Sequence, residues 1–146
     1  MSDYTIIQDT REQKPLFKNS SHTTVEVGTL KTGDYSLKGY EEKISIERKS
    51  LGDLFGTLGK GHARFKRELS RALELDYFAI VVEGGYRKIR DKDFEGSYHS
   101  KMKGHVILQI LFTLHMKYGI NFFLAADRNE SKSIIKSLFK AYTKQV

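Results

Sequence analysis

The residues with the clearest capacity for chemistry are three charged side chains in two neighbouring segments. In one segment isoleucines alternate with polar residues, so a strand would place Glu47 and Lys49 on one face and Arg48 with the isoleucines on the other. Asp34 begins the preceding segment, and a hairpin between the two would fold Asp34 back beside Glu47. The sequence therefore predicts two carboxylates next to one ammonium group.

Two carboxylates held side by side repel each other, and a divalent cation bound between them relieves the repulsion. Oxygen ligands of this kind favour Mg²⁺ or Mn²⁺. Such an ion can lower the pKa of a bound water and neutralise charge that grows on a phosphate during cleavage. Lys49 would orient or deprotonate the water, or stabilise the pentacovalent phosphate. The sequence leaves these roles open, but it favours phosphodiester hydrolysis.

A second charged group follows the first predicted strand. Asp9 and Glu12 lie where that strand leaves the sheet, which is a common location for ligand-binding residues. They could complete the site or hold a second ion. Arg11, between them, could bind a phosphate through two parallel hydrogen bonds.

The elements that must position these residues follow from the hydrophobic pattern. The first half predicts strands over 4–9, 23–30, 35–38 and 43–49, in an order that suggests an antiparallel meander. A capping box from Ser50 to Asp53 predicts the start of a short helix. The second half predicts an amphipathic helix over 62–75, a strand buried on both faces over 77–83, a polar loop over 86–104, a nearly all-apolar helix over 105–118, a strand over 121–125 and a helix over 130–144. We expect one α/β domain, residues 1–146, with a mixed sheet covered by helices on both faces.

Composition narrows the class of protein and of partner. The chain has 146 residues and no cysteine, which rules out disulfides and thiolate zinc sites, and its five histidines lack zinc-site spacing. A net charge of +7 implies attraction to a polyanion, either nucleic acid or an anionic membrane surface. No apolar stretch approaches the length of a membrane span, and the N-terminus lacks a signal-peptide pattern. We expect an intracellular protein with no membrane partner.

Several basic residues are candidates for DNA contact. They are Arg11, Arg48, Arg64, Arg87, Lys101 and Lys103. Each of two has a structural alternative: Arg48 would pair with a buried acid from the isoleucine face, and Arg64 would bridge Glu68 one helical turn away. Asp53 would serve only as a cap or lie behind the catalytic residues. The lysines spaced four apart on the last helix are more often a solubilising face than a DNA-binding one.

Three ordered blocks of the sequence resemble a nuclease family. These blocks are Asp9-x-Arg11-Glu12, Gly33-Asp34-Tyr35 and Glu47-Arg48-Lys49-Ser50 with Asp53, followed by Arg64, Glu68 and Val82-Glu83-Gly84. They resemble the nuclease signature of the XPF family of structure-specific endonucleases, a branch of the PD-(D/E)XK superfamily. The resemblance implies a restriction-endonuclease-like fold.

The resemblance also implies a function. It is Mg²⁺- or Mn²⁺-dependent cutting of branched or partly single-stranded DNA (flap, fork or four-way junction) in repair or recombination, by a domain that pairs with a second copy or a relative. Asp34, Glu47 and Lys49 match the catalytic core of that family, with Asp9 and Glu12 as supporting acids and metal ligands. The sequence has no room for the helix-hairpin-helix or helicase domain common in relatives, so branch specificity would come from this domain, from dimerisation or from a separate DNA-binding or helicase partner.

Two other functions fit the same fold. One is a non-catalytic, nuclease-like scaffold that binds DNA and guides a partner enzyme, although the complete set of carboxylates argues against it. The other keeps the metal site but acts as a resolvase, an RNase or a nicking enzyme. The apolar stretch from Val106 to Met116 motivates a further expectation of homodimerisation.

Overall fold

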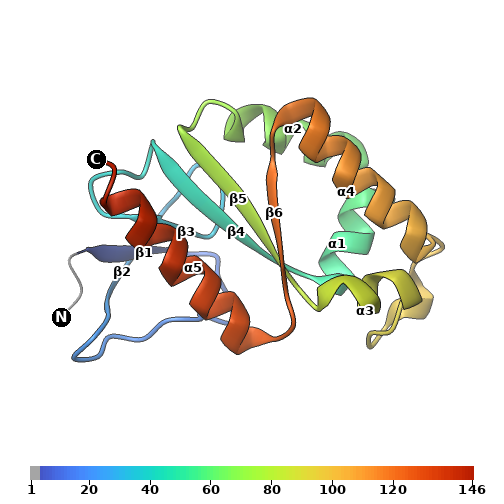
Figure 1. The fold of residues 1–146 in the computed structure, drawn as a ribbon, viewed down its shortest axis with the longest axis horizontal. Helices are drawn as coiled ribbons and strands as arrows, with labels where there is room; N and C mark the ends of the chain where they lie inside the picture. Colours follow the sequence, from blue (N-terminus) through green and yellow to red (C-terminus); the bar gives the residue numbers. More distant parts are fainter. Residues whose placement is uncertain (1–3) are drawn as a thin grey trace.

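The computed structural model describes residues 4–146, and its centre is a six-stranded sheet in the order β2-β1-β3-β4-β5-β6 (Figure 1). The strands are β1 (Thr5–Asp9), β2 (Thr24–Gly28), β3 (Tyr35–Leu37), β4 (Ile44–Ser50), β5 (Tyr77–Glu83) and β6 (Asn121–Ala125). All six overlap segments that the sequence predicts as strands. The expected α/β class with a mixed sheet is confirmed.

The pairing of the strands corrects the predicted meander. β1–β3 and β3–β4 are antiparallel, but β2 pairs parallel to β1 at the sheet edge, and β4, β5 and β6 are mutually parallel. A parallel pair needs a connection long enough to return the chain to the starting end of the first strand. The segment 10–23 is long enough for this, and it brings Thr24 opposite Thr5.

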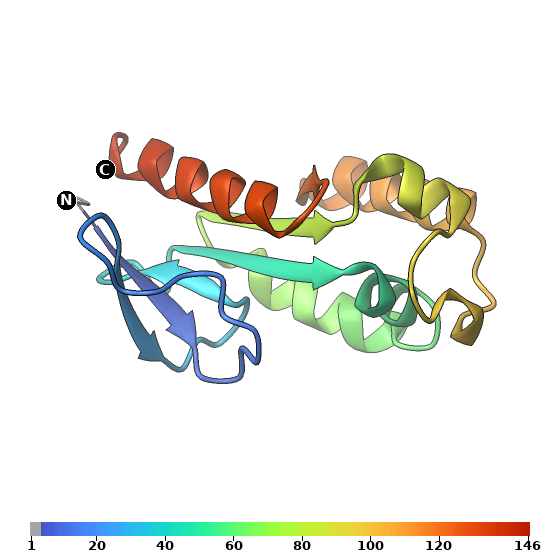
Figure 2. The same cartoon turned by 90° about the horizontal axis from the view of Figure 1, so that it is seen from below.

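Helices cover both faces of the sheet. They are α1 (Leu51–Leu58), α2 (His62–Ala72), α3 (Gly85–Asp91), α4 (Gly104–Tyr118) and α5 (Arg128–Thr143). In Figure 2, α5 lies on one side of β4, and α1 and α2 lie on the other. α4 contacts α1, α3 and β6. None of the helices in the described part of the chain is long and apolar enough to cross a membrane.

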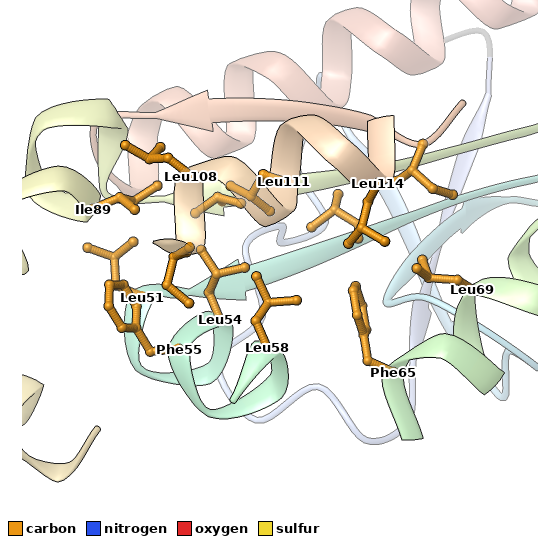
Figure 3. Packing of buried hydrophobic residues seen from close by; sticks show 14 of the residues in the cluster. Leu51, Leu54, Phe55, Leu58, Phe65, Leu69, Ile89, Leu108, Leu111 and Leu114 are labelled. Atoms are coloured by element: carbon orange, nitrogen blue, oxygen red, sulfur yellow. The ribbon is translucent and has the colours of Figure 1, made fainter. Parts of the chain in front are cut away.

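Two hydrophobic cores hold these layers together. The first lies between α1, α2, α4 and one face of β5, and Figure 3 shows leucines of α1 and α4 packed against each other. The second lies between α5 and β1, β3 and β4. Neighbouring β5 residues alternate between the cores, with Ile80 and Val82 in the first and Val81 in the second. This explains the continuous apolar sequence of β5, because both of its faces are buried.

Two predicted elements differ from the structure. The predicted polar loop contains α3 and a short 3₁₀ helix, Ser97–His99. α3 has one buried residue, Ile89, and so lacks the repeated apolar spacing by which a helix is recognised. The second is the nearly all-apolar helix α4, whose apolar residues are not all buried within the chain, since Phe112 is 52% exposed and Met116 is 83% exposed. The predicted start of α1 at Ser50 is confirmed, because the Ser50 side chain accepts a hydrogen bond from the Asp53 amide, which is one of the two bonds of a capping box.

The close contact of α3 with the start of α4 gives a prediction about Gly104. A Cβ at this position would overlap the carbonyl oxygens of Ile89 and Arg90. We expect Gly104→Ala to lower the free energy of unfolding by about 2 kcal/mol or more, measured by urea denaturation. Gly52→Ala is the control, because nothing lies within 4 Å of a Cβ there and alanine favours helix α1. Equal stability of the two variants would contradict this packing.

Candidate active site

The predicted acids Asp34 and Glu47 meet in a cleft of about 240 Å³ on the α2 side of the sheet. The lining residues are Asp9, Arg11, Lys31, Thr32, Gly33, Asp34, Glu47, Glu68 and Arg71. They come from the end of β1, the segment before β3, the middle of β4, and α2. The cleft thus combines residues that are far apart in the sequence.

The antiparallel pairing of β3 and β4 positions the first acid. The Asp34 amide donates to the Ile46 carbonyl at 2.9 Å, and the Asp34 carboxylate accepts from the Arg48 amide at 2.8 Å. Gly33 makes this close approach possible, because its φ is +79° and a Cβ there would overlap the Ser45 hydroxyl. Asp34 is therefore held to the backbone of β4 on both sides of Glu47.

The two carboxylates are electrostatically coupled. Burial, followed by the charge of Glu47, raises the pKa of Asp34 to about 7, in spite of the hydrogen bond from the Arg48 amide. Burial also raises the pKa of Glu47, and the charges of Glu68 and Asp53 act in the same direction while Lys49 opposes them. The site therefore holds more negative charge than its lysine neutralises, which is the situation that favours a bound cation.

Lys49 lies beside Glu47, as the alternation of β4 predicts. Its ammonium is 3.6 Å from the Glu47 carboxylate and 5.7 Å from the centre of the Phe65 ring on α2. Both side chains of the pair are largely shielded from solvent, with 14% of Lys49 and 18% of Glu47 exposed. α2 thus covers the ion pair and confines the lysine to the site.

Asp9 and Arg11 bind each other in this structure. The Asp9 side chain is 2% exposed and accepts from the Arg11 guanidinium at 2.7 Å and from the Leu30 amide at 2.8 Å. Although burial alone would raise it, the pKa of Asp9 is lowered overall by the hydrogen bonds from Arg11 and Leu30. Glu12 accepts from the Tyr35 hydroxyl at 3.1 Å. These contacts fasten the end of β1, and they leave Asp9 less available to a metal than Asp34 or Glu47.

Arg48 points to the opposite face of the sheet. Its guanidinium makes two hydrogen bonds of 3.0 Å to the Glu83 carboxylate and a third, of 2.9 Å, to the Lys14 carbonyl. Glu83 also accepts from the Ser131 hydroxyl of α5 at 2.8 Å. This is the pairing with an acid that the isoleucine face of β4 suggests, and it occupies the groups with which Arg48 would contact DNA.

The other basic candidates lie outside the lining of the cleft. Arg64 is 3.5 Å from Glu68 in an ion pair across one helical turn, with 81% of the arginine side chain exposed. Arg87 is exposed on α3. Lys101 and Lys103 are exposed just before α4.

The donor chemistry of the cleft suits a hard divalent cation. Asp34 and Glu47 offer carboxylate oxygens, the ligand type that Mg²⁺ and Mn²⁺ prefer. Within residues 4–146, however, no three His, Cys, Asp or Glu side chains lie close enough together to form a ready metal-binding group. The ligand type thus suits such a cation, and the acids concerned are the pair Asp34 and Glu47, with Glu68 on the facing helix.

A family comparison matches residues 8–138, which include every predicted catalytic residue, to the ERCC4 domain. The chain belongs to the ERCC4 domain family. A search of curated protein sequences found no match. The resemblance carried by the ordered sequence blocks is thus confirmed at the level of the family.

Solved structures with the same fold include two of XPF from Aeropyrum pernix. One is 24% identical over 95% of this chain and 65% of that chain, with a TM-score of 0.73. The other, described as a complex with DNA, is 23% identical over 97% of this chain and 66% of that chain, with a TM-score of 0.72. The present chain therefore spans just under two thirds of each of these proteins, and the likeness at this identity concerns the fold.

Sequence reasoning did not place Arg71, Lys31 and Thr32 of this ERCC4 domain at the site. It included Glu68 in the family resemblance and in an ion pair with Arg64, but gave it no place among the catalytic acids. Glu68 and Arg71 flank the apolar stripe of α2, so their positions follow from how α2 packs on β4. Lys31 and Thr32 reach the cleft through the turn before Gly33. For Glu68 the available signals were its part in the family resemblance and its acidic side chain beside that apolar stripe, which also fits a surface ion pair.

The raised pKa of Asp34 predicts how the stability of the protein depends on pH. In the unfolded chain this carboxyl ionises near its usual 3.8, whereas in the folded protein it ionises at about 7. Its contribution to stability is therefore complete below about pH 4 and is lost as the pH rises to about 7. We expect Asp34→Asn to raise the free energy of unfolding by roughly 1–3 kcal/mol at pH 8 and by almost nothing at pH 4.

Chemical denaturation at the two pH values, in the presence of a chelator, measures this difference. A substitution of an exposed acid, Glu26→Gln, serves as the control, since its carboxylate forms a surface pair with Lys38. A pH-independent effect of Asp34→Asn would show that the carboxylate is not strained by burial and by Glu47.

Proposed function

We propose that this ERCC4 domain is a divalent-metal-dependent endonuclease that hydrolyses phosphodiester bonds in DNA. The observation that carries the proposal is the coupled pair Asp34 and Glu47, next to Lys49, in one polar cleft. Membership of the ERCC4 family supports it, as does the common fold with an XPF protein described in complex with DNA. The net charge of +7 suits a polyanionic substrate.

Asp34 and Glu47 would hold a Mg²⁺ or Mn²⁺ ion, with Asp9 and Glu68 as further acids of the cleft and Glu12 outside its lining. When bound, the ion would lower the pKa of the attacking water and offset negative charge that develops on the phosphate. Asp34 must be ionised to act as a ligand, and the fixed hydrogen bond from the Arg48 amide keeps one carboxylate oxygen in place. Glu47 precedes Arg48 in the same strand, so both acids have a rigid support.

Lys49 would act on the reacting groups directly. Its ammonium is held near Glu47 but at 3.6 Å, which is longer than a strong charged hydrogen bond. With Glu47 as a ligand of the ion, the Lys49 ammonium would be available to donate to the attacking water or to a non-bridging phosphate oxygen. Because α2 covers it, the lysine would do so without moving far.

The proposed substrate is branched or partly single-stranded DNA, such as a flap, a fork or a four-way junction, and the proposed setting is repair or recombination. This choice follows the resemblance to structure-specific nucleases. Exposed basic residues on α2, on α3 and before α4 would contact DNA outside the cleft, namely Arg64, Arg87, Lys101 and Lys103. A separate DNA-binding or helicase protein would add branch specificity.

Cleavage of a substrate panel tests the proposal. With Mg²⁺ the protein should cut a labelled fork, flap or four-way junction faster than duplex, single strand or RNA, and a chelator should stop the cutting. Asp34→Asn, Glu47→Gln and Lys49→Met should each lower the rate by about 10²–10⁴-fold. Glu26→Gln, which alters an exposed acid, should leave it unchanged.

The panel also separates the proposal from its alternatives. DNA binding without cutting of any substrate would establish the non-catalytic scaffold. Preference for RNA or for a nick in plain duplex would keep the metal site and change the substrate class. Equal activity of the wild type and the three cleft variants would exclude this cleft as the active site.

A homodimer through α4 forms part of the proposal. The outer face of α4 exposes Val106, Phe112 and Met116. A groove of about 230 Å³ beside Phe112 is lined mainly by apolar side chains of α4 and of the edge strand β6, namely Leu108, Leu111, Phe112, His115, Phe122 and Leu124. Apolar area of this kind usually marks a contact with another chain.

We expect light scattering to give the wild type a mass twice that of one chain at micromolar concentration. Phe112→Glu combined with Met116→Glu should give the monomer mass, because two charges would be buried without partners in the contact. Leu73→Glu is the matched control, since Leu73 is 50% exposed at the end of α2 and does not line this groove. A monomeric wild type would rule out the dimer.

A further inference from the structure

A second polar cavity lies on the opposite side of the sheet from the acidic cleft, where the segment before β2 passes α5 (Figure 1). It has a volume of about 440 Å³, and we call it the loop–helix pocket. Its lining residues are Pro15, Leu16, Phe17, Lys18, Ser20, Thr23, Arg128, Lys132 and Lys136. Four of these are cations, and none is an acid.

The cations of the pocket keep their charge unneutralised. Among residues 4–146, the ion pairs within 4 Å include none of Lys18, Arg128, Lys132 or Lys136. The acid whose pKa Arg128 influences, Glu83, is already engaged by Arg48 and Ser131. Such a concentration of positive charge attracts anions.

Specific contacts hold some of the cations of the pocket in place. Arg128 donates to the carbonyl oxygens of Lys14 and Pro15, so its position is fixed by neutral partners. Lys136 donates to the Thr23 hydroxyl at 2.8 Å and lies 5.9 Å from the centre of the Phe17 ring. Two of the four cations are therefore held in place by the loop across the cavity.

A hydroxyl in the lining is available to donate as well. The Ser20 oxygen accepts hydrogen bonds from the amides of His22 and Thr23, both at 3.1 Å. Because its lone pairs are used by these amides, the hydroxyl can still donate its hydrogen to a ligand. Lysine, arginine and a hydroxyl donor together are the groups with which proteins contact a DNA phosphate.

The pocket is connected to the catalytic strand through Lys14. The Lys14 carbonyl accepts from Arg48 at 2.9 Å and from Arg128 at 3.5 Å. Arg48 lies between Glu47 and Lys49 in β4, and its side chain points to the pocket side of the sheet. A ligand held in the pocket would therefore keep a fixed position relative to the acidic cleft.

We propose that the loop–helix pocket binds a backbone phosphate of the DNA substrate, on the face of the sheet opposite the catalytic acids. This inference rests on the proposed nuclease function. The basic residues spaced four apart along α5 are thereby divided into two groups. Arg128, Lys132 and Lys136 are assigned to DNA, whereas Lys140 and Lys144 form a solubilising surface. One arm of a branched substrate would then pass around the ends of β4 and β5.

Paired substitutions on and off the pocket test this. Lys18→Gln with Lys132→Gln removes two charges from the pocket, and Lys140→Gln with Lys144→Gln removes two from the end of α5, outside the pocket. The affinity for a fluorescent fork, measured by anisotropy with a chelator at several salt concentrations, gives the slope of log K against log salt. In the pocket variant that slope should become shallower by about 0.9 for each phosphate that the protein no longer neutralises, and by much less in the control.

Steady-state cutting provides a second measurement. The pocket variant should raise KM several-fold with kcat unchanged, because the phosphate contact is remote from the reacting atoms. Lys18→Arg with Lys132→Arg should keep both the slope and KM of the wild type, since it preserves the two charges. Circular dichroism and the melting temperature of each variant check that it is folded.

The outcomes separate this inference from the function on which it rests. If the wild type neither binds nor cuts DNA, the proposed function fails and the pocket proposal fails with it. If the wild type cuts DNA while the pocket variant and the control change slope and KM equally, only the pocket proposal is overturned.

Discussion

The ion pair between Arg48 and Glu83 is the interaction on which the arrangement of both faces depends. It joins the ends of the parallel strands β4 and β5, and its further hydrogen bonds reach Ser131 of α5 and the Lys14 carbonyl. With 14% of Arg48 and 21% of Glu83 exposed, removal of either partner would leave a poorly hydrated charge. Arg48 is flanked in β4 by Glu47 and Lys49, whose side chains pair with each other on the opposite face of the sheet.

The cleft itself opposes folding. Burial makes both Asp34 and Glu47 harder to ionise, and the charge of Glu47 adds to this at Asp34, whose pKa is raised to about 7. Two separate hydrophobic cores, on either side of the sheet, supply the stability that offsets it. A strained, well-supported group is the usual condition of a functional site, since activity and maximal stability place different demands on the same residues.

Much of this organisation can be predicted from the sequence because it depends on local pattern. The alternation in β4 correctly separates Glu47 and Lys49 from Arg48, and Ser50 marks the start of α1. What the pattern does not contain is information on long-range pairing. The parallel position of β2 depends on the path of the 10–23 segment, and the entry of Glu68 into the cleft depends on the packing of α2. Likewise, the pairing of Arg11 with Asp9 depends on the position of the Asp9 carboxylate, which is held by the Leu30 amide, 21 residues further along the chain.

The distribution of charge shows why the cleft is insufficient by itself to attract a substrate. Asp9, Asp34, Glu47 and Glu68 line it together with Lys31, Arg11 and Arg71, and Arg11 is already paired with Asp9. Before a cation binds, such a cleft offers a phosphate little net attraction, although the chain as a whole carries +7. We expect the attraction to come from basic surfaces outside the cleft. The loop–helix pocket, on the far side of β4, is the surface that we propose for this role, and Arg48 connects it to β4 through the Lys14 carbonyl.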